Sequence, residues 1–518
     1  MPRSDDRRTK VPLIDQDGAM ATRRRRRRLI APVGRAARRG ARSAQARLVP
    51  VLGGRTRARV IVVLACVLAL SSADTATVGS AAIELRRSLH ITNTDIGILV
   101  AVTSVVGAVF SLPFGVLVDR TRRTTLLGIA IVAWGAAMIW SATAGSFGEL
   151  LLARLALGAV TAVAGPAVAS LVGDWFPGGD RGQIYSYVLT GELLGAGVGF
   201  AVTGDVASLS WRLAFVVLAI PAFVIAWSVF HLREPARGGQ GALLPDPGTP
   251  AWETAQSAAA RRPGGRGAHA AATAPAGPAG DDGEITDAQR LALDRGIRPD
   301  PVLVARGRPR MRFVEAVRFV LSVRTNVALI VSGACGYYFL AGVETFGVEF
   351  VTRQYHVDQV LANLLLLVVG AGAVVGVLVA GPLGDRLLRR GILPGRVMVA
   401  AVAAALTVLL FVPALVTHSA LGALPYIVLA AAALSAQNPP IDSARLDIMP
   451  PWLWGRAEGV RTFVRTGAQA LAPLLFGVVA DDVFGGGASG LRWTFVVMLA
   501  PLTASALYLF TAARRYPR

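Results

Sequence analysis

Charged and amide side chains occur inside long apolar segments of this chain. A charge near the centre of a bilayer costs roughly 2.5 kcal/mol or more, and it persists only where it faces protein or a water-filled cavity. Groups held there could bind a polar solute or carry a proton. The candidates for these roles are Asp74, Arg154, Glu192, Glu344, Gln437, Asn438, Asp442 and Arg445.

Three of the candidate carboxylates have surroundings that suit reversible protonation. Asp74 has hydroxyl residues on both sides, Glu192 lies near the middle of its apolar run, and Glu344 follows two tyrosines. A carboxyl group in a dry cavity can gain and lose a proton near neutral pH. Arg154 could pair with such a carboxylate, so that proton, substrate and arginine compete for it. The alternative is a permanent buried ion pair that holds helices together.

The segment 437–447, which reads QNPPIDSARLD, combines a proline break with an acidic and a basic residue three positions apart. Broken backbone at membrane depth is tolerated where it is buried in protein or lines a cavity. Gln437 and Asn438 are therefore candidate substrate contacts, and a simple packed kink is the alternative. Arg461 and Arg465 are expected either to meet the aspartates of this segment or to extend toward the membrane surface.

The elements that must position these groups are membrane-spanning helices. Of 518 residues, 53% are hydrophobic and only 16% are charged, against about a quarter charged in soluble proteins. Because lipid offers no hydrogen-bond partner, each apolar run must be helical. The fold class is thus an all-α polytopic membrane protein with twelve transmembrane helices in two six-helix halves. The runs lie at about 59–83, 95–118, 125–145, 149–173, 184–204, 212–232, 327–351, 360–383, 396–416, 423–448, 458–480 and 491–513.

Polar segments divide the chain further. We expect a disordered basic tail at 1–57, an N-terminal six-helix half at 58–232 and a largely disordered linker at 233–310. The remainder comprises 311–513, which begins with a short interfacial helix and continues as the second six-helix half, and a tail at 514–518. Two cysteines and five histidines lie apart from one another, so no metal or other cofactor is predicted.

The net charge of +21 is carried almost entirely by arginine, and residues 23–28 are six arginines in a row. The tail that holds them has no aromatic residue to stack on bases, which argues against nucleic-acid binding and favours contact with anionic lipid. Arginine also collects in alternate loops. The positive-inside rule then places both termini in the cytoplasm of a multi-pass protein, which we expect in the plasma membrane.

One motif occurs twice at equivalent positions. The second run ends in GVLVDRTRR and the eighth in GPLGDRLLRR, with glycine and the acidic residue at the same spacing. A glycine lets two helices approach closely, and the aspartate can pair with arginines or with the positive N-terminus of a neighbouring helix. Such a contact can break and reform, as a gate requires. The gating candidates are Gly115, Asp119, Arg120, Arg123, Gly381, Asp385, Arg386 and Arg390.

These motifs, over residues 59–513, resemble the major facilitator superfamily. The first copy is similar to the family's G-x-L-A-D-R-x-G-R-K, and Arg154-x-x-x-Gly158 to its R-x-x-x-G. The segment Asp74-Thr-Ala-Thr-Val78 and the EPARG after the sixth run look like the spinster-like branch, which is associated with lysolipid-type substrates and proton coupling. That branch often has an acidic residue at the position of Thr161, so its proton role there does not carry over.

The sequence therefore predicts a secondary active transporter, not an enzyme, working by alternating access as a monomer on a small-molecule substrate. A proton is the expected coupling ion, and export of an amphipathic, drug-like or lipid-like compound, as by an antiporter, is favoured. Uptake of a small organic solute is the first alternative. A membrane-embedded transferase is another, but the outer loops hold no catalytic cluster. No nucleotide-binding G-x-x-x-x-G-K-[ST] occurs, which disfavours ATP-driven transport.

Overall fold

The computed structural model describes residues 54–237, 291–292, 295, 311–357, 359–485 and 487–516. The arginine-rich run 23–28 and most of the predicted linker 233–310 lie outside these residues. The described residues from 60 onward belong to one unit, and the account below concerns that unit.

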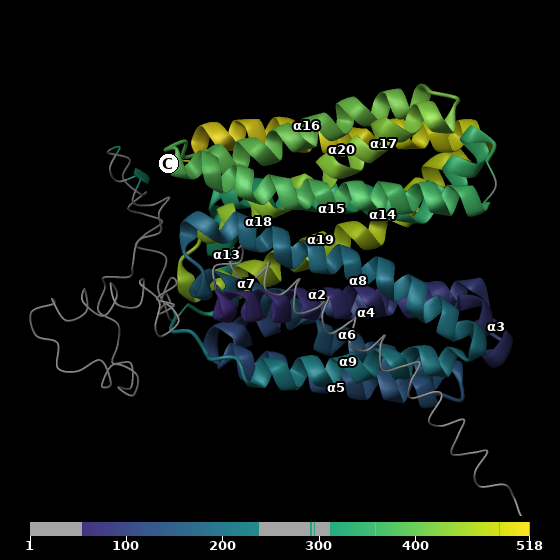
Figure 1. The fold of residues 1–518 in the computed structure, drawn as a ribbon, viewed down its shortest axis with the longest axis horizontal. Coiled ribbons are helices and arrows are strands. Elements are labelled where there is room, and N and C mark those ends of the chain that lie inside the picture. The colour runs from purple at the N-terminus through teal and green to yellow at the C-terminus, as the bar shows by residue number, and fades with distance from the viewer. Residues whose placement is uncertain are drawn as a thin grey trace, which may run out of the picture. The chain divides into compact units, whose positions relative to one another are not determined.

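Within the described residues, twelve helical segments are long and apolar enough to cross a membrane. This confirms the predicted fold class. Figure 1 shows them as a bundle of roughly parallel helices. The spanning helices of the first half are α2 (Arg55–Ser80), α4 (Asn93–Arg120), α5 (Arg123–Thr143), α6 (Phe147–Thr161) with α7 (Ala164–Trp175), α8 (Arg181–Leu209) and α9 (Trp211–Phe230). Those of the second half are α14 (Arg324–Tyr355), α15 (Gln359–Arg389), α16 (Gly395–Val416), α17 (Ala420–Ala436) with α18 (Asn438–Ile448), α19 (Trp454–Val478) and α20 (Gly487–Arg515).

The fourth and tenth spans are each broken at a matching place. The tenth breaks at Gln437, as the two prolines after it require, because proline has no N–H to donate and clashes with the preceding turn. The fourth breaks between Thr161 and Ala164, and Pro166 lies in the first turn of α7. The break in the tenth span was predicted from the sequence, whereas the fourth span was expected to be continuous.

The two halves lie on opposite sides of the bundle in Figure 1. In the first half α5 packs against α9, and α4 and α5 pack against α6. In the second, α16 packs against α17 and α20, and α15 against α17. The helix pairs that join the halves most extensively are α4 with α19, α8 with α15, α7 with α19 and α8 with α18.

Small residues bring α8 close to α2. A Cβ added to Gly191 would lie 2.5 Å from the carbonyl oxygen of Ala65, and Gly195 and Gly199 face Ala69 and Ala73 in the same way at successive turns. A side chain at any of these glycines would force the helices apart. The glycines of the fifth span thus serve close packing.

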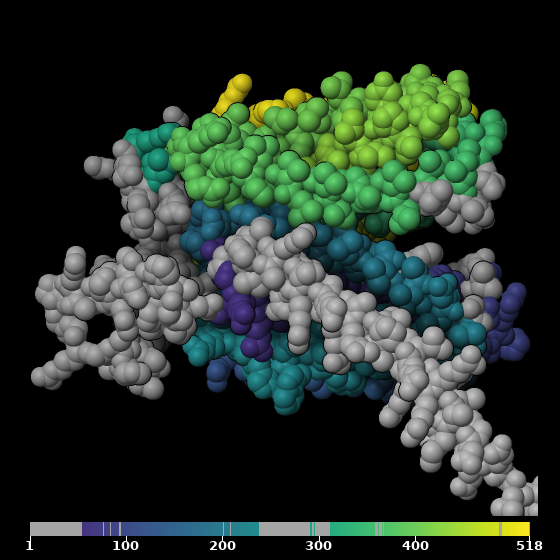
Figure 2. Space-filling model, viewed as in Figure 1, coloured from purple at the N-terminus to yellow at the C-terminus, as the bar shows by residue number. Residues whose placement is uncertain are grey.

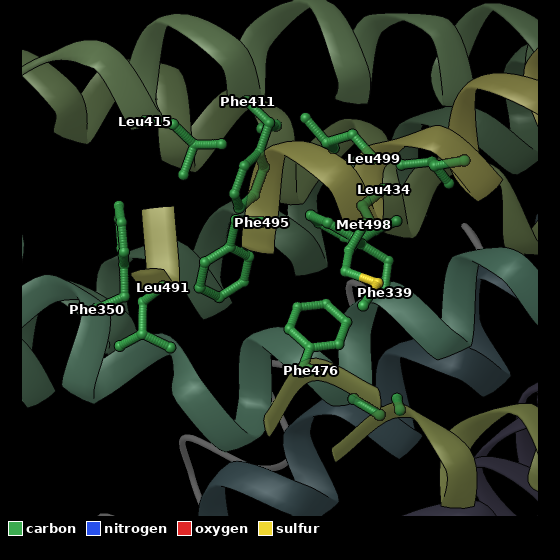
Figure 3. Close-up of a cluster of buried hydrophobic side chains, with 14 of the residues drawn as sticks. Phe339, Phe350, Phe411, Leu415, Leu434, Phe476, Leu491, Phe495, Met498 and Leu499 are labelled. Carbon is green, nitrogen blue, oxygen red and sulfur yellow. The ribbon is translucent and has the colours of Figure 1, made fainter. Parts of the chain in front are cut away.

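Aromatic rings fill the core of the second half (Figure 3). Phe339 of α14 meets Phe411 of α16 edge to face, with ring centroids 5.0 Å apart. Phe495 of α20 and Phe476 of α19 complete the group at 5.4 Å from each other. These contacts tie four helices of the half into one body, which is the condition for moving it as a unit.

The short helix predicted after the linker is present as α13 (Phe313–Ser322). Its Ala316, Phe319 and Val320 are buried, whereas Val314 and Leu321 are exposed apolar side chains on the outer face. An apolar outward face on a short helix is typical of a helix at a membrane surface. That location stays a prediction.

Candidate functional site

The C-terminal end of α4 binds the N-terminus of α19 through Asp119. One carboxylate oxygen of Asp119 accepts the backbone N–H of Gly455 at 2.8 Å, and the other accepts that of Arg456 at 3.1 Å. The Arg456 side chain adds an ion pair at 3.1 Å. The carboxylate therefore binds free N–H groups at the positive end of a helix dipole. We call this contact the α4–α19 latch.

Asp385 makes the equivalent contact from α15 to α8. Its carboxylate accepts the backbone N–H groups of Gly182 at 3.1 Å and Gln183 at 2.7 Å. Arg396 of α16 pairs with the same carboxylate at 2.6 Å. This is the α15–α8 latch. Each latch joins one half to the other, and the two halves exchange the roles of donor and acceptor.

Glycines permit the close approach that both latches need. A Cβ added to Gly115 would lie 2.7 Å from the carbonyl oxygen of Gly455, and one added to Gly182 would lie 2.8 Å from that of Gly381. One turn further in, Ser111 donates its hydroxyl hydrogen to the carbonyl of Gly459 at 3.0 Å. At the end of the bundle that carries the latches, the halves are thus in backbone contact.

The predicted gating arginines behave differently from one another. Arg120, Arg386 and Arg390 are exposed. Arg123 is fully buried and pairs with Asp174 at the end of α7, not with Asp119. The counterpart of Arg123 in the second half is Arg396, which pairs with Asp447 at the end of α18. The loop between Asp385 and Arg396 is longer than the loop between Asp119 and Arg123. The spacing of the first motif therefore pointed to Arg390 and not to Arg396.

The segment that leaves the sixth span also contacts the first latch region. Glu234 accepts hydrogen bonds from the Arg123 side chain at 2.7 Å and from the backbone N–H of Thr124 at 2.8 Å. Burial alone would raise the pKa of Glu234, but these donors outweigh it and lower the pKa below its ordinary value. Arg237 donates to the carbonyls of Val118 and Thr121, at the end of α4. The first residues after the sixth span therefore fix the loop that carries Asp119.

Asp74 and Arg154 form a buried pair in the first half. Arg154 donates to the Asp74 carboxylate at 2.9 Å, and the two residues are 2% and 1% exposed. The guanidinium also lies over the ring of Phe215, 4.7 Å from its centroid. The structure thus brings together the carboxylate and the arginine that the sequence analysis named as partners. A carboxylate with a single cationic partner in a dry site can exchange that partner for a proton.

A second buried network occupies the latch side of the second half. Arg461 pairs with Asp442 at 2.6 Å and with Glu458 at 2.7 Å. Arg445 pairs with Glu458 at 2.7 Å instead of with Asp442, the acidic residue three positions before it. The network predicted for Arg461 is therefore present, but Glu458 at its centre was missed. Its only sequence signal is an acidic residue between two arginines in the motif RAEGVR.

Removing the charge of Glu458 should be costly because it would leave Arg445 without its carboxylate in a buried site. We expect Glu458→Gln to lower the free energy of unfolding by about 3–5 kcal/mol, as for other broken buried pairs. Denaturant unfolding of the detergent-purified protein measures this. Glu349→Gln, at a pair whose side chains are 42% and 49% exposed, is the control and should change stability by less than about 1 kcal/mol. Equal effects of the two substitutions would contradict the role of Glu458.

A different set of side chains faces the space between the halves. Tyr337 and Glu344 lie two turns apart on α14, Arg465 is on α19, and Glu192 is on α8 of the other half. The Arg465 guanidinium lies 4.6 Å from the ring centroid of Tyr337. The charges of Glu192 and Glu344 interact, and Tyr337 is within electrostatic reach of Glu192 and Arg465. Figure 2 shows the halves separated by a hollow toward the end that carries α3 (Ala82–Leu89).

The amides at the break of the tenth span have mixed surroundings. Gln437 is fully buried against Gly336 of α14, and neither atom of its amide group has a hydrogen-bond partner among the described residues. Asn438 is half-buried, and its side-chain oxygen is unpaired within the same part of the chain. An unpaired buried amide is costly, so these groups suit a ligand or water that supplies the missing bonds. Their contact with substrate stays a prediction.

The two six-helix halves are in contact at one end and parted at the other. Charged side chains lie along the boundary between them, which we call the seam and define by Glu192, Tyr337, Glu344 and Arg465. This arrangement is that of a secondary transporter. The chain belongs to the Major Facilitator Superfamily, whose family pattern matches residues 64–424 and 329–518. It is thus a transporter-family protein and not an enzyme.

Known proteins agree on the fold and leave the substrate open. A probable L-galactonate transporter of Escherichia coli (strain K12) is 24% identical over 165 residues, which are 31% of this chain and 36% of that protein. A solved proton:xylose symporter has a TM-score of 0.63 at 16% identity and covers 88% of this chain and 95% of its own. A bacterial homologue of the human lysosomal transporter Spinster has a TM-score of 0.54 at 18% identity and covers 89% and 98%. The latter likeness shows the shared fold and does not single out the spinster-like branch.

Proposed function

We propose that this protein moves a small organic solute by proton-coupled alternating access. The observation that carries the proposal is the pair of latches, each made by an aspartate of one half on a helix N-terminus of the other. Because the same end of the bundle holds both, breaking them opens one entrance, while the hollow at the opposite end provides the other. A symmetric pair of reversible contacts is what a rocking motion of two rigid halves requires.

Proton coupling is supported by the Asp74–Arg154 pair. Protonation of Asp74 would release Arg154, and renewed pairing with Arg154 would displace the proton. Proton uptake and release at Asp74 can therefore be coupled to opening and closing of the two entrances. The structural neighbours include a proton:xylose symporter, which makes a proton a reasonable coupling ion here.

The chemistry of the seam favours a polar solute. Glu192, Glu344, Tyr337 and Arg465 present charges and a hydroxyl group to the space between the halves. The relative named as a probable L-galactonate transporter points to a hydrophilic substrate as well. Export of an amphipathic compound, which the apolar spans suggested, is the competing hypothesis.

We also propose that the latch end faces the cytoplasm of a plasma-membrane protein, with both termini on that side. The arginines of the loops that follow Asp119 and Asp385 support this orientation through the positive-inside rule.

Counterflow in proteoliposomes tests the proposal. Vesicles loaded with a panel of sugars, sugar acids, amines and amphipathic drugs are diluted into labelled solute, with and without an imposed pH gradient. We expect at least one polar solute to exchange and its accumulation to follow the pH gradient. Exchange that is unaffected by the pH gradient would contradict the proposed proton coupling. Exchange of amphipathic drugs alone would favour the competing hypothesis.

A further inference from the structure

Opposite charges occupy equivalent places in the two halves. Glu192 lies ten residues after Gly182, the first N–H donor of the α15–α8 latch, and Arg465 lies ten residues after Gly455, the first donor of the α4–α19 latch. The fifth and eleventh spans therefore carry a carboxylate and a guanidinium at the same depth. The repeat places one on each side of the seam.

Glu192 and Arg465 do not form an ion pair with each other. Among the described residues, no ion pair joins Glu192 or Glu344 to any cation, although other acidic side chains buried in the bundle are paired. Glu344 is exposed, and Glu192 and Arg465 are half-buried. Two interacting carboxylates without a counter-ion disfavour each other, so the arrangement calls for a cation from outside.

Arg465 is positioned to take an anion. Its guanidinium is held by the face of the Tyr337 ring at 4.6 Å, and its Nε atom has no hydrogen-bond partner in the described part of the chain. Tyr337 itself is 7% exposed, and its hydroxyl group makes no hydrogen bond with a described residue. The Tyr337 hydroxyl oxygen is not among the buried unpaired atoms, and Arg465 makes no ion pair with a described residue, so both groups are available to a polar ligand.

We propose that the seam binds a zwitterionic organic solute, with its ammonium group between Glu192 and Glu344 and its carboxylate on Arg465 and Tyr337. This inference rests on the proposed transport function and specifies its substrate class. The neighbouring Asp442–Arg461–Glu458–Arg445 network is internally neutral, so it leaves the site with two negative charges and one positive charge. A solute that is only anionic would add to the negative excess. A solute that is only cationic would leave Arg465 unmatched.

Two sets of matched compounds test the charge requirement by thermal unfolding of the purified full-length protein. One set is galacturonate, galactosamine and 2-amino-2-deoxygalacturonate, and the other is butyrate, butylamine and 4-aminobutyrate. We expect the zwitterion of at least one set to raise the unfolding temperature while its singly charged partners do not. A singly charged compound that stabilises as well as its zwitterion, or no stabilisation by any compound, would overturn the inference. Gradient-driven counterflow of another solute would still uphold the proposed function in that case.

Substitutions assign the two ends of the ligand. Arg465→Gln and Glu344→Gln should each weaken binding of the zwitterion about tenfold or more, the loss expected for one hydrogen-bonded charge. Arg465→Lys keeps the charge and should retain more of the affinity than Arg465→Gln. The exposed pair Arg353 and Glu349, on the same helix as Glu344, supplies the controls Arg353→Gln and Glu349→Gln, which should bind as the wild type does. Equal binding by all four neutralised variants would contradict the assignment.

Discussion

Asp74→Asn is expected to reduce solute accumulation driven by a pH gradient about a hundredfold, while exchange without a gradient continues. Asparagine keeps the shape of the side chain and can still accept from Arg154, but it cannot take up and release a proton. The coupling step is then lost although the path for the solute is intact. Uptake of labelled solute into proteoliposomes, with and without the gradient, measures the two activities separately.

Two further variants make the Asp74 result specific. Asp74→Glu retains a titratable group and should keep part of the gradient-driven activity. Asp481→Asn changes an exposed aspartate near the far end of the eleventh span and should behave as the wild type. Gradient-driven accumulation that survives in Asp74→Asn would remove this residue from the coupling mechanism and leave the Asp74–Arg154 pair as a structural contact.

Gly115→Val is expected to prevent closure of the latch end and to reduce transport about a hundredfold. The first atom of any side chain at this position would lie 2.7 Å from the Gly455 carbonyl oxygen and 3.1 Å from the Cα atom of Arg456, both backbone atoms that cannot move aside. The state with both latches formed then becomes inaccessible. A single cysteine introduced near Asp119 should react faster with a membrane-impermeant reagent in this variant than in the wild-type background.

The same helix offers the control. Gly97→Val places the same side chain on α4 where no atom lies within 4 Å of the added Cβ, and it should leave both transport and cysteine reactivity near wild-type values. Reagent applied from each side of the membrane also reports which side the latch end faces. Normal transport by Gly115→Val would contradict the latch mechanism.

Most of the fold could be predicted because lipid leaves the chain few choices. Apolar runs of sufficient length had to be helices, and the repeat of the aspartate motifs fixed the division into halves. The break at Gln437 followed from two consecutive prolines. The matching break after Thr161 could not be predicted in the same way, because Pro166 lies in the first turn of α7, where proline fits a helix without disrupting it.

The site could be predicted less completely, since its partners come from distant segments. Asp74 and Arg154 were identified because each is conspicuous in an apolar run. The ends of the apolar runs are rich in charge, and no local pattern there distinguishes a buried partner from an exposed loop residue. Three of the partners lie at such ends, namely Arg456, Arg396 and Glu458. Which arginine meets which aspartate depends on loop length and helix rotation, and these are properties of the packed structure.

Each interrupted span consists of a piece next to the latches and a piece nearer the opposite end of the bundle. α7 and α18 pack on helices of the opposite half, whereas their continuations α6 and α17 pack mainly on helices of their own halves. Bending at Thr161–Ala164 and at Gln437 would therefore allow the entrance opposite the latches to narrow over a bound solute before either latch is released. An occluded intermediate, sealed on both sides, is thus available without moving the whole of either half.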